Sequence, residues 1–362
     1  MPTIEQHFFK MFAFHNEPLL LLPPRQCLTV HTVCFNMTLN STLTGSDPTQ
    51  ALLWTDVVSY ICYLLLPMVI FFCVLGQLVN IVILSSQVRL SLDTYLLGMS
   101  IAALLHVFTT TVLCAPYYLA YSEWLVHVQY YSLISREWFT HIYLWLLVSL
   151  SIERSVTFSI HKTFIPGTSS QTWIITGVVT CVGLVSVLPR LWEYTILALQ
   201  HNSTSHVTII YRTPVAEGAG FSIIYFWYLS SMFVILPVFL MVAACIILCQ
   251  SAETDLSKTF DRKHSSHSVM ASNRQIIEDK ALTKLVIIII VVNLVFTSPF
   301  IFFHIFAGVA PGIIQLDSAI TITLQNIFTI LYYINFILHQ QLYFCFNKQY
   351  RITLLSICCC CC

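Results

Sequence analysis

The sequence predicts an all-α membrane protein built around a seven-transmembrane helix bundle. Of its 362 residues, 57% are hydrophobic and only 9% are charged, whereas about a quarter of the residues in a soluble domain are charged. Lipid cannot satisfy the hydrogen-bonding groups of the backbone, so long apolar runs should form helices. Seven runs are long enough to cross a bilayer, at about residues 57–86, 92–120, 126–159, 171–191, 221–249, 281–308 and 319–345.

Basic residues and glycosylation sequons predict the orientation. With the N-terminus outside, eleven of the 16 lysines and arginines lie in the cytosol and five outside, as the positive-inside rule requires. Sequons at Asn36, Asn40 and Asn202 then share the extracellular side, and we expect them to be glycosylated. The chain divides into an extracellular N-terminal arm (1–56), the bundle (57–345) and a cytosolic amphipathic helix with a Cys-rich tail (346–362). We expect it in the plasma membrane.

The third run carries charged residues at both of its ends. Arg136 and Arg154 are eighteen residues apart, which is about 27 Å or five turns of a helix. They therefore project from one face of the helix at its two ends, which we call the outer and inner mouths of the bundle. Glu137 and Glu153 flank them. One mouth can receive a ligand and the other can pass on a signal. An equally good interpretation of the outer pair is a cap that only meets the lipid headgroups.

Cysteine usage does not indicate a disulfide scaffold. Most of the 14 cysteines lie inside apolar runs, where cysteine behaves as a small hydrophobe. Cys27 and Cys34 lie in the polar part of the arm, and both a local disulfide and free thiols remain open. Cysteines close to a membrane are typical S-acylation sites, so we expect the tail to carry palmitate and to contact membrane lipid. The residues concerned are Cys358, Cys359, Cys360, Cys361 and Cys362.

Several motifs resemble those of the rhodopsin-like G-protein-coupled receptors. The run Gly76–Asn80 looks like the signature of the first helix, Pro237 and Pro299 occupy the usual kink positions, and Tyr343–Arg351 resembles the passage into the short amphipathic eighth helix. Glu153-Arg154-Ser155 stands where the family has Asp/Glu-Arg-Tyr. The resemblance implies that Glu153, Arg154 and Tyr343 couple to a heterotrimeric G protein.

Other positions depart from the family pattern. Ala103 and Tyr143 replace the residues of the family's sodium site, Thr297 stands where the switch tryptophan is usual, and His339 begins the run that replaces Asn-Pro-x-x-Tyr. The usual disulfide is missing too, because Gln129 stands near its expected position and residues 192–220 contain no cysteine. The entrance must therefore be held by other contacts.

The ligand is expected at the outer mouth. Pro189–Glu193 is similar to a run in FMRFamide-type neuropeptide receptors, which implies an extracellular peptide ligand. Arg136 suits a carboxylate or an amidated peptide end and disfavours a small amine. The expected ligand-binding residues are Arg136, Glu137, Thr140, Arg190, Glu193, His304 and Asp317.

Other functions are weaker interpretations. A chemosensory receptor for a small molecule would share this architecture, and a transporter or channel should show internal repeats, which are absent from the sequence. We expect no enzyme, no cofactor and no metal, because the His264 and His267 pair lies in a polar loop between 250 and 280. The zero net charge gives no reason to expect nucleic acid. Six polar residues within the runs should be mostly satisfied by packing: His106, His141, Asn293, Asn326, Asn335 and His339.

Overall fold

The computed structural model describes residues 49–87, 91–115, 122–159, 169–202, 205–214, 219–261, 270–309 and 318–360. These residues are mostly helical. The long helices are α2 (Thr49–Ser85), α3 (Ser91–Cys114), α4 (Glu123–Ser159), α5 (Ser169–Val187), α8 (Ala219–Ser230), α9 (Leu236–Asp261), α10 (Met270–Val309) and α11 (Ser318–Phe346). The shorter elements are α6 (Arg190–Glu193), the π-helix η2 (Ser231–Ile235), α12 (Lys348–Cys360) and an antiparallel hairpin of β1 (Tyr194–Asn202) and β2 (Ser205–Arg212).

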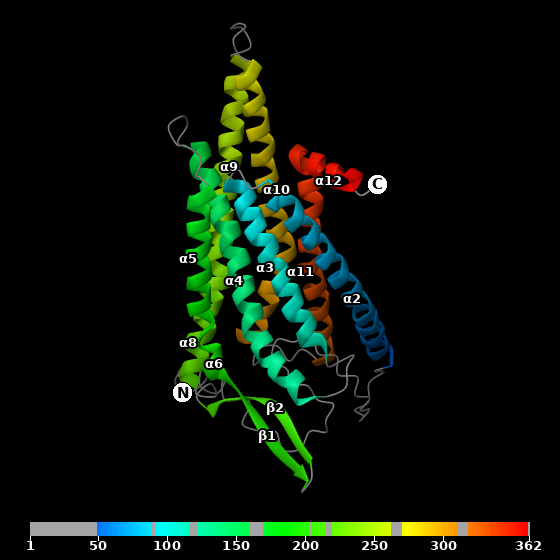
Figure 1. Ribbon diagram of the computed structural model, residues 1–362. Coiled ribbons are helices and arrows are strands. Elements are labelled where there is room, and N and C mark those ends of the chain that lie inside the picture. Colours follow the sequence, from blue (N-terminus) through cyan, green and yellow to red (C-terminus); the bar gives the residue numbers. More distant parts are fainter. Residues whose placement is uncertain are drawn as a thin grey trace.

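The long helices lie side by side in one bundle (Figure 1). Helix α2 packs against α3 and α11, α11 packs against α10, and α4 packs against α3, α5, α9 and α10, so the helices form a closed ring. The β1–β2 hairpin lies at one end of this bundle and α12 at the other (Figure 1). We call these the hairpin end and the α12 end.

The bundle is that of a multi-pass membrane protein. Five helices in the described part of the chain are long and apolar enough to cross a membrane, with spans at Leu64–Ser85, Ser91–Leu113, Ser170–Glu193, Trp227–Gln250 and Thr283–Phe300. Large apolar side chains such as Phe71, Phe108 and Phe239 are exposed on its outside, whereas Asn80 and Asn293 are buried inside. This distribution suits a lipid environment, in which polar groups must find partners within the protein.

Helices α4 and α11 are not among the five spans found in the described residues, and both carry polar residues. These residues face inward: His141 on α4 and Asn335 and His339 on α11 are all buried. A helix in the interior of a bundle can be less apolar than one that contacts lipid. The seven-span prediction is therefore supported at five positions by helix length and composition.

The motif of the first predicted span fixes α11 and α12 against α2. A Cβ atom on Gly76 would collide with the side chain of Gln340, so glycine permits the close approach of α11. Gln77 donates to the carbonyl of Phe336 at 3.0 Å, and Asn80 accepts the hydroxyl of Tyr350 at 2.6 Å. Burial raises the pKa of Tyr350 to about 12, so its hydroxyl stays protonated as a donor.

A π-helix precedes Pro237, one of the two predicted kink positions. In η2 the N–H of Leu236 donates to the carbonyl of Ser231, five residues earlier. The next bond in this register would run from residue 237 to Met232, but proline has no N–H. Instead, Nε1 of Trp145 on α4 donates to the Met232 carbonyl at 3.2 Å. A side chain of a neighbouring helix thus satisfies the acceptor that proline leaves open.

We expect Trp145→Phe to lower the stability of the bundle by about 1–2 kcal/mol, because the Met232 carbonyl then has no donor in an apolar environment. Thermal denaturation of the purified chain in detergent measures the change. Trp173→Phe is the matched control, since Trp173 is exposed on α5. Equal melting temperatures for the two variants would contradict this role of Trp145.

One sequence prediction needs correction, and one element was not anticipated. Residues 49–56, at the end of the expected N-terminal arm, are helical, because α2 begins at Thr49. The polar segment 250–280 is largely helical, because α9 continues to Asp261 and α10 begins at Met270. The hairpin was not anticipated, although the β-branched and aromatic residues from Tyr194 to Arg212, interrupted at the Asn202 sequon, carry its signal.

Candidate functional site

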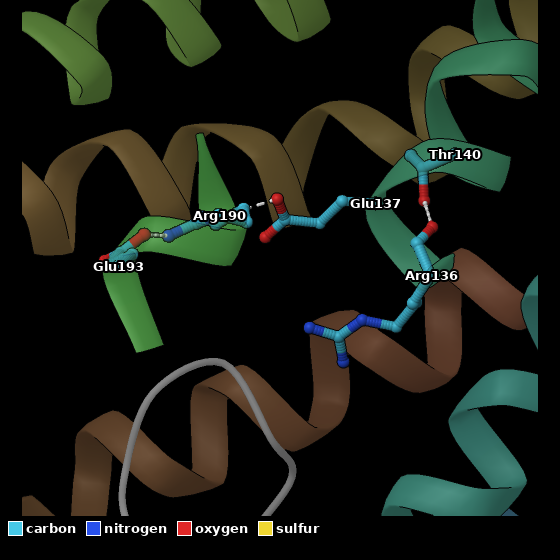
Figure 2. A network of polar contacts seen from close by, with 5 residues as sticks. All are labelled: Arg136, Glu137, Thr140, Arg190 and Glu193. Carbon is cyan, nitrogen blue, oxygen red and sulfur yellow. Dashed lines mark hydrogen bonds and ion pairs between the residues drawn. The ribbon is translucent and has the colours of Figure 1, made fainter. Parts of the chain in front are cut away.

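A buried ion-pair cluster stands at the hairpin end, where three elements meet. Arg190 of α6 donates through Nε to Oε2 of Glu137 on α4 at 2.8 Å, and its Nη1 pairs with Glu193 (Figure 2). The guanidinium carbon lies 5.2 Å from the centre of the Tyr225 ring on α8. Arg190 and Glu193 are both buried. The cluster thus ties α4, α6 and α8 together, directly before β1 begins.

Three of the predicted ligand contacts are therefore brought together, but they are engaged with one another. Arg190 pairs with both Glu137 and Glu193, which disfavours a free role for any of the three. Glu193 is three residues after Arg190 on α6, and the packing of the fold brings Glu137 of α4 beside them. Tyr225, the fourth member, was missed because nothing in the sequence relates it to these residues.

Arg136 lies apart from the cluster. Figure 2 draws no contact between its guanidinium and Arg190, Glu137 or Glu193. Its backbone carbonyl accepts the hydroxyl of Thr140 at 2.9 Å, and this hydroxyl also lies 3.0 Å from Nδ1 of His106 on α3. The ring of His106 contacts three aromatic rings of α11, those of Tyr332, Tyr333 and Phe336, with centroid distances of 5.5 to 5.9 Å. A half-buried cation thus stands beside an aromatic interior.

The remaining outer-mouth predictions lie outside the described residues. These are Asp317 and the side chain of His304, although the backbone of His304 belongs to α10. The sequons at Asn36 and Asn40 and the Cys27 and Cys34 pair are also outside them. Asn202 ends β1 at the turn of the hairpin, but its side chain is not described. The same holds for the side chains of Cys358–Cys360 in α12, whereas Cys361 and Cys362 lie beyond the described residues.

Side-chain contacts hold the hairpin where the sequence lacks a disulfide. Gln129 on α4 donates to the carbonyl of Leu113 on α3 at 3.1 Å. The hydroxyl of Tyr130 lies 3.2 Å from the carbonyl of Leu191 and 3.3 Å from that of Tyr194. Tyr194 also packs with Leu113 and Leu133 in a small apolar cluster. These contacts hold the start of the hairpin against α3 and α4.

The predicted coupling residues gather at the α12 end. Arg154 is only 8% exposed, and its neighbour Ser155 donates to the carbonyl of Ala244 on α9 at 3.2 Å. Ser91 of α3 donates to Glu153 at 2.5 Å. Tyr343 is buried, with its ring centre 6.2 Å from that of Tyr350. This end of the bundle is therefore closed over Arg154.

The expectation that internal polar residues are satisfied holds for most of them. His106, Asn293, Asn335 and His339 all form side-chain hydrogen bonds. Two residues depart from it: within the described part of the chain neither polar atom of the buried Asn326 amide has a hydrogen-bond partner, and Nδ1 of His141 has none either. The sequence shows that such residues are polar and buried, but not which neighbours they meet.

Comparison with known proteins adds no family assignment. A scan against protein-family models finds no match, and a search of curated proteins finds no significant relative. Function must therefore be argued from the residues themselves.

Proposed function

We propose that this chain is a divergent rhodopsin-like G-protein-coupled receptor of the plasma membrane. In this proposal its N-terminus and hairpin end are extracellular, an extracellular peptide binds at the hairpin end, and a heterotrimeric G protein binds at the α12 end. The observation that carries the proposal is the position of Arg154. It follows a carboxylate at the α12 end of α4, the helix that packs against α3, α5, α9 and α10.

The closed α12 end supports a switch mechanism. Arg154 is covered while Ser155 holds α4 to α9, so a G protein can reach the guanidinium only after α9 or α10 moves away from α4. A ligand shifts the equilibrium toward the open arrangement if it binds that arrangement more tightly. The size of the shift is set by the difference between its affinities for the open and closed arrangements. The guanidinium then offers several directed donors to the partner's acceptors.

The hairpin end supports a peptide as the ligand class. Arg190 is paired with Glu137 and Glu193, whereas Arg136 is a half-buried cation from which Figure 2 draws no contact to these three residues. In this proposal Arg136 binds the carboxylate or amidated end of a peptide, and the aromatic residues around His106 bind its apolar part.

The test combines a ligand screen with one substitution. Cells that express the chain are screened with a peptide library and several G-protein reporters. We expect Arg154→Ala to reach the surface and bind the active peptide but to lose ligand-evoked activation by at least about tenfold, because the contact with the G protein is lost. Arg351→Ala is the matched control at the same end, since this arginine donates to the carbonyls of Phe344 and Cys345, at the end of the preceding helix. Undiminished activation by Arg154→Ala at equal surface expression would refute the mechanism.

A further inference from the structure

A chain of polar side chains crosses the middle of the bundle and joins three helices. The hydroxyl of Tyr143 on α4 lies 2.9 Å from Nδ1 of His339 on α11. The amide of Asn335 on α11 lies 3.5 Å from the same hydroxyl and donates to Oδ1 of Asn293 on α10 at 2.8 Å. Thr297 on α10 donates to this Oδ1 at 3.3 Å. All five side chains are buried.

Three of these residues are positions at which the sequence departs from the receptor pattern. Tyr143, Thr297 and His339 are far apart in the sequence, and each alone is only a lost motif residue. The structure shows that they belong to one hydrogen-bonded chain. The departures are thus related, because each residue supplies a donor or acceptor that its neighbours use.

The directions of the bonds place the Tyr143–His339 bond at the centre. The Tyr143 oxygen accepts from Asn335, so its own proton is available for Nδ1 of His339. This is a buried hydrogen bond between α4 and α11, where water does not compete. The Tyr143 ring also packs edge-on against Phe336 at 5.0 Å, which holds the hydroxyl in position.

The chain is incomplete in the closed arrangement. Oδ1 of Asn335 is buried without a hydrogen-bond partner in the described part of the protein. A buried polar network with an unsatisfied member is held less firmly than a complete one, so a second arrangement can lie close in free energy. Switching elements need such a small difference between two packed states.

We propose that the Tyr143–His339 bond is a latch that holds α4 against α11 and α10 and keeps the α12 end closed over Arg154. The latch separates when the bundle opens. This inference rests on the proposed receptor function, which supplies the need for opening. The position of the bond supports it further, since the ring of His339 lies 6.4 Å from that of Tyr343, and Tyr343 lies beside Tyr350 at the α12 end.

The test measures opening without a G protein. Tyr143→Phe removes the hydroxyl and keeps the ring, and amide hydrogen exchange of the full chain in nanodiscs is followed by mass spectrometry. We expect about tenfold faster exchange at residues 151–159 of α4 and 270–285 of α10, the factor that corresponds to a lost hydrogen bond of about 1.4 kcal/mol. His339→Gln, whose amide oxygen can accept the Tyr143 proton, should restore slower exchange than His339→Phe.

Tyr333→Phe is the matched control. Its buried hydroxyl donates to Thr110 at 2.7 Å between α11 and α3, so it loses an equivalent bond outside the chain. We expect a similar loss of thermal stability but no faster exchange at the two α12-end segments. If Tyr143→Phe and Tyr333→Phe give the same exchange pattern, the bond is only structural and the latch is refuted. If Tyr143→Phe does not fold, His339→Phe against His339→Gln makes the same comparison.

The two proposals can fail separately. If exchange is faster in Tyr143→Phe but the screen gives no G-protein response, the latch is supported and the receptor function is contradicted. If a ligand evokes activation but exchange is unchanged in Tyr143→Phe, the latch is contradicted and the receptor function is supported.

Discussion

Replacement of Arg190 by methionine is expected to destabilise the hairpin end by roughly 3–5 kcal/mol, the largest effect on stability of any single change considered for this protein. Glu137 and Glu193 both pair with Arg190, and their side chains are only 18% and 6% exposed. Without the guanidinium, two carboxylates remain close together in a poorly hydrated site, where neither charge is compensated by this partner. Thermal denaturation of the purified chain measures the loss.

The control for Arg190→Met removes the charges together. In the triple variant Arg190→Met, Glu137→Gln and Glu193→Gln no ionised group is left in the cluster, so most of the lost stability should return. The rate of proteolytic cleavage within β1–β2 reports the effect on the hairpin alone. This rate should increase in Arg190→Met but not in the triple variant. A single variant with the stability of the natural chain would mean that the cluster contributes nothing to the fold.

The second large effect is expected at Gly183, where α5 meets α4. A Cβ atom at this position would lie 2.7 Å from Cδ2 of His141 and 3.3 Å from Cδ1 of Trp138. The His141 ring cannot easily retreat, because it packs edge-on against Phe233 with ring centres 4.7 Å apart. Gly183→Ala should therefore cost about 1–3 kcal/mol through overpacking, measured as a lower melting temperature.

Gly177 supplies the matched control in the same helix. An added Cβ there meets nothing within 4 Å. Gly177→Ala should leave stability unchanged or raise it by up to about 1 kcal/mol, because alanine favours a helix more than glycine does. If the two substitutions have the same effect, helix propensity alone determines the outcome, and the close contact with His141 has no energetic consequence.

The positions of the spanning helices could be predicted because their signal is local. Five predicted apolar runs coincide with helices that can cross a membrane. Lipid imposes the same requirement on each segment separately, namely an apolar surface with all backbone bonds made within the helix. The hairpin was missed because its β-branched and aromatic residues, within Tyr194–Arg212, form two short segments between two strong helical signals.

The partners of the polar residues could not be predicted, because each contact joins helices that are distant in the chain. The spacing of Arg136 and Arg154 placed them at opposite ends of one helix, and the structure has both on α4. Nothing in that spacing shows that Glu137, the neighbour of Arg136, pairs with Arg190, as Figure 2 shows. Side-chain pairing between helices depends on their rotation and depth, which many contacts determine together.

The sequence by itself determined that this is a helical membrane protein, where its apolar helices lie and which residues stand at the two ends of α4. Composition and periodicity suffice for this because the solvent, lipid, acts on every segment alone. Only the tertiary structure decided that Arg190 is neutralised by two carboxylates and that Tyr143, Thr297 and His339 form one chain with two asparagines. A buried polar group must find a partner, and the packing of the helices decides which one is within reach.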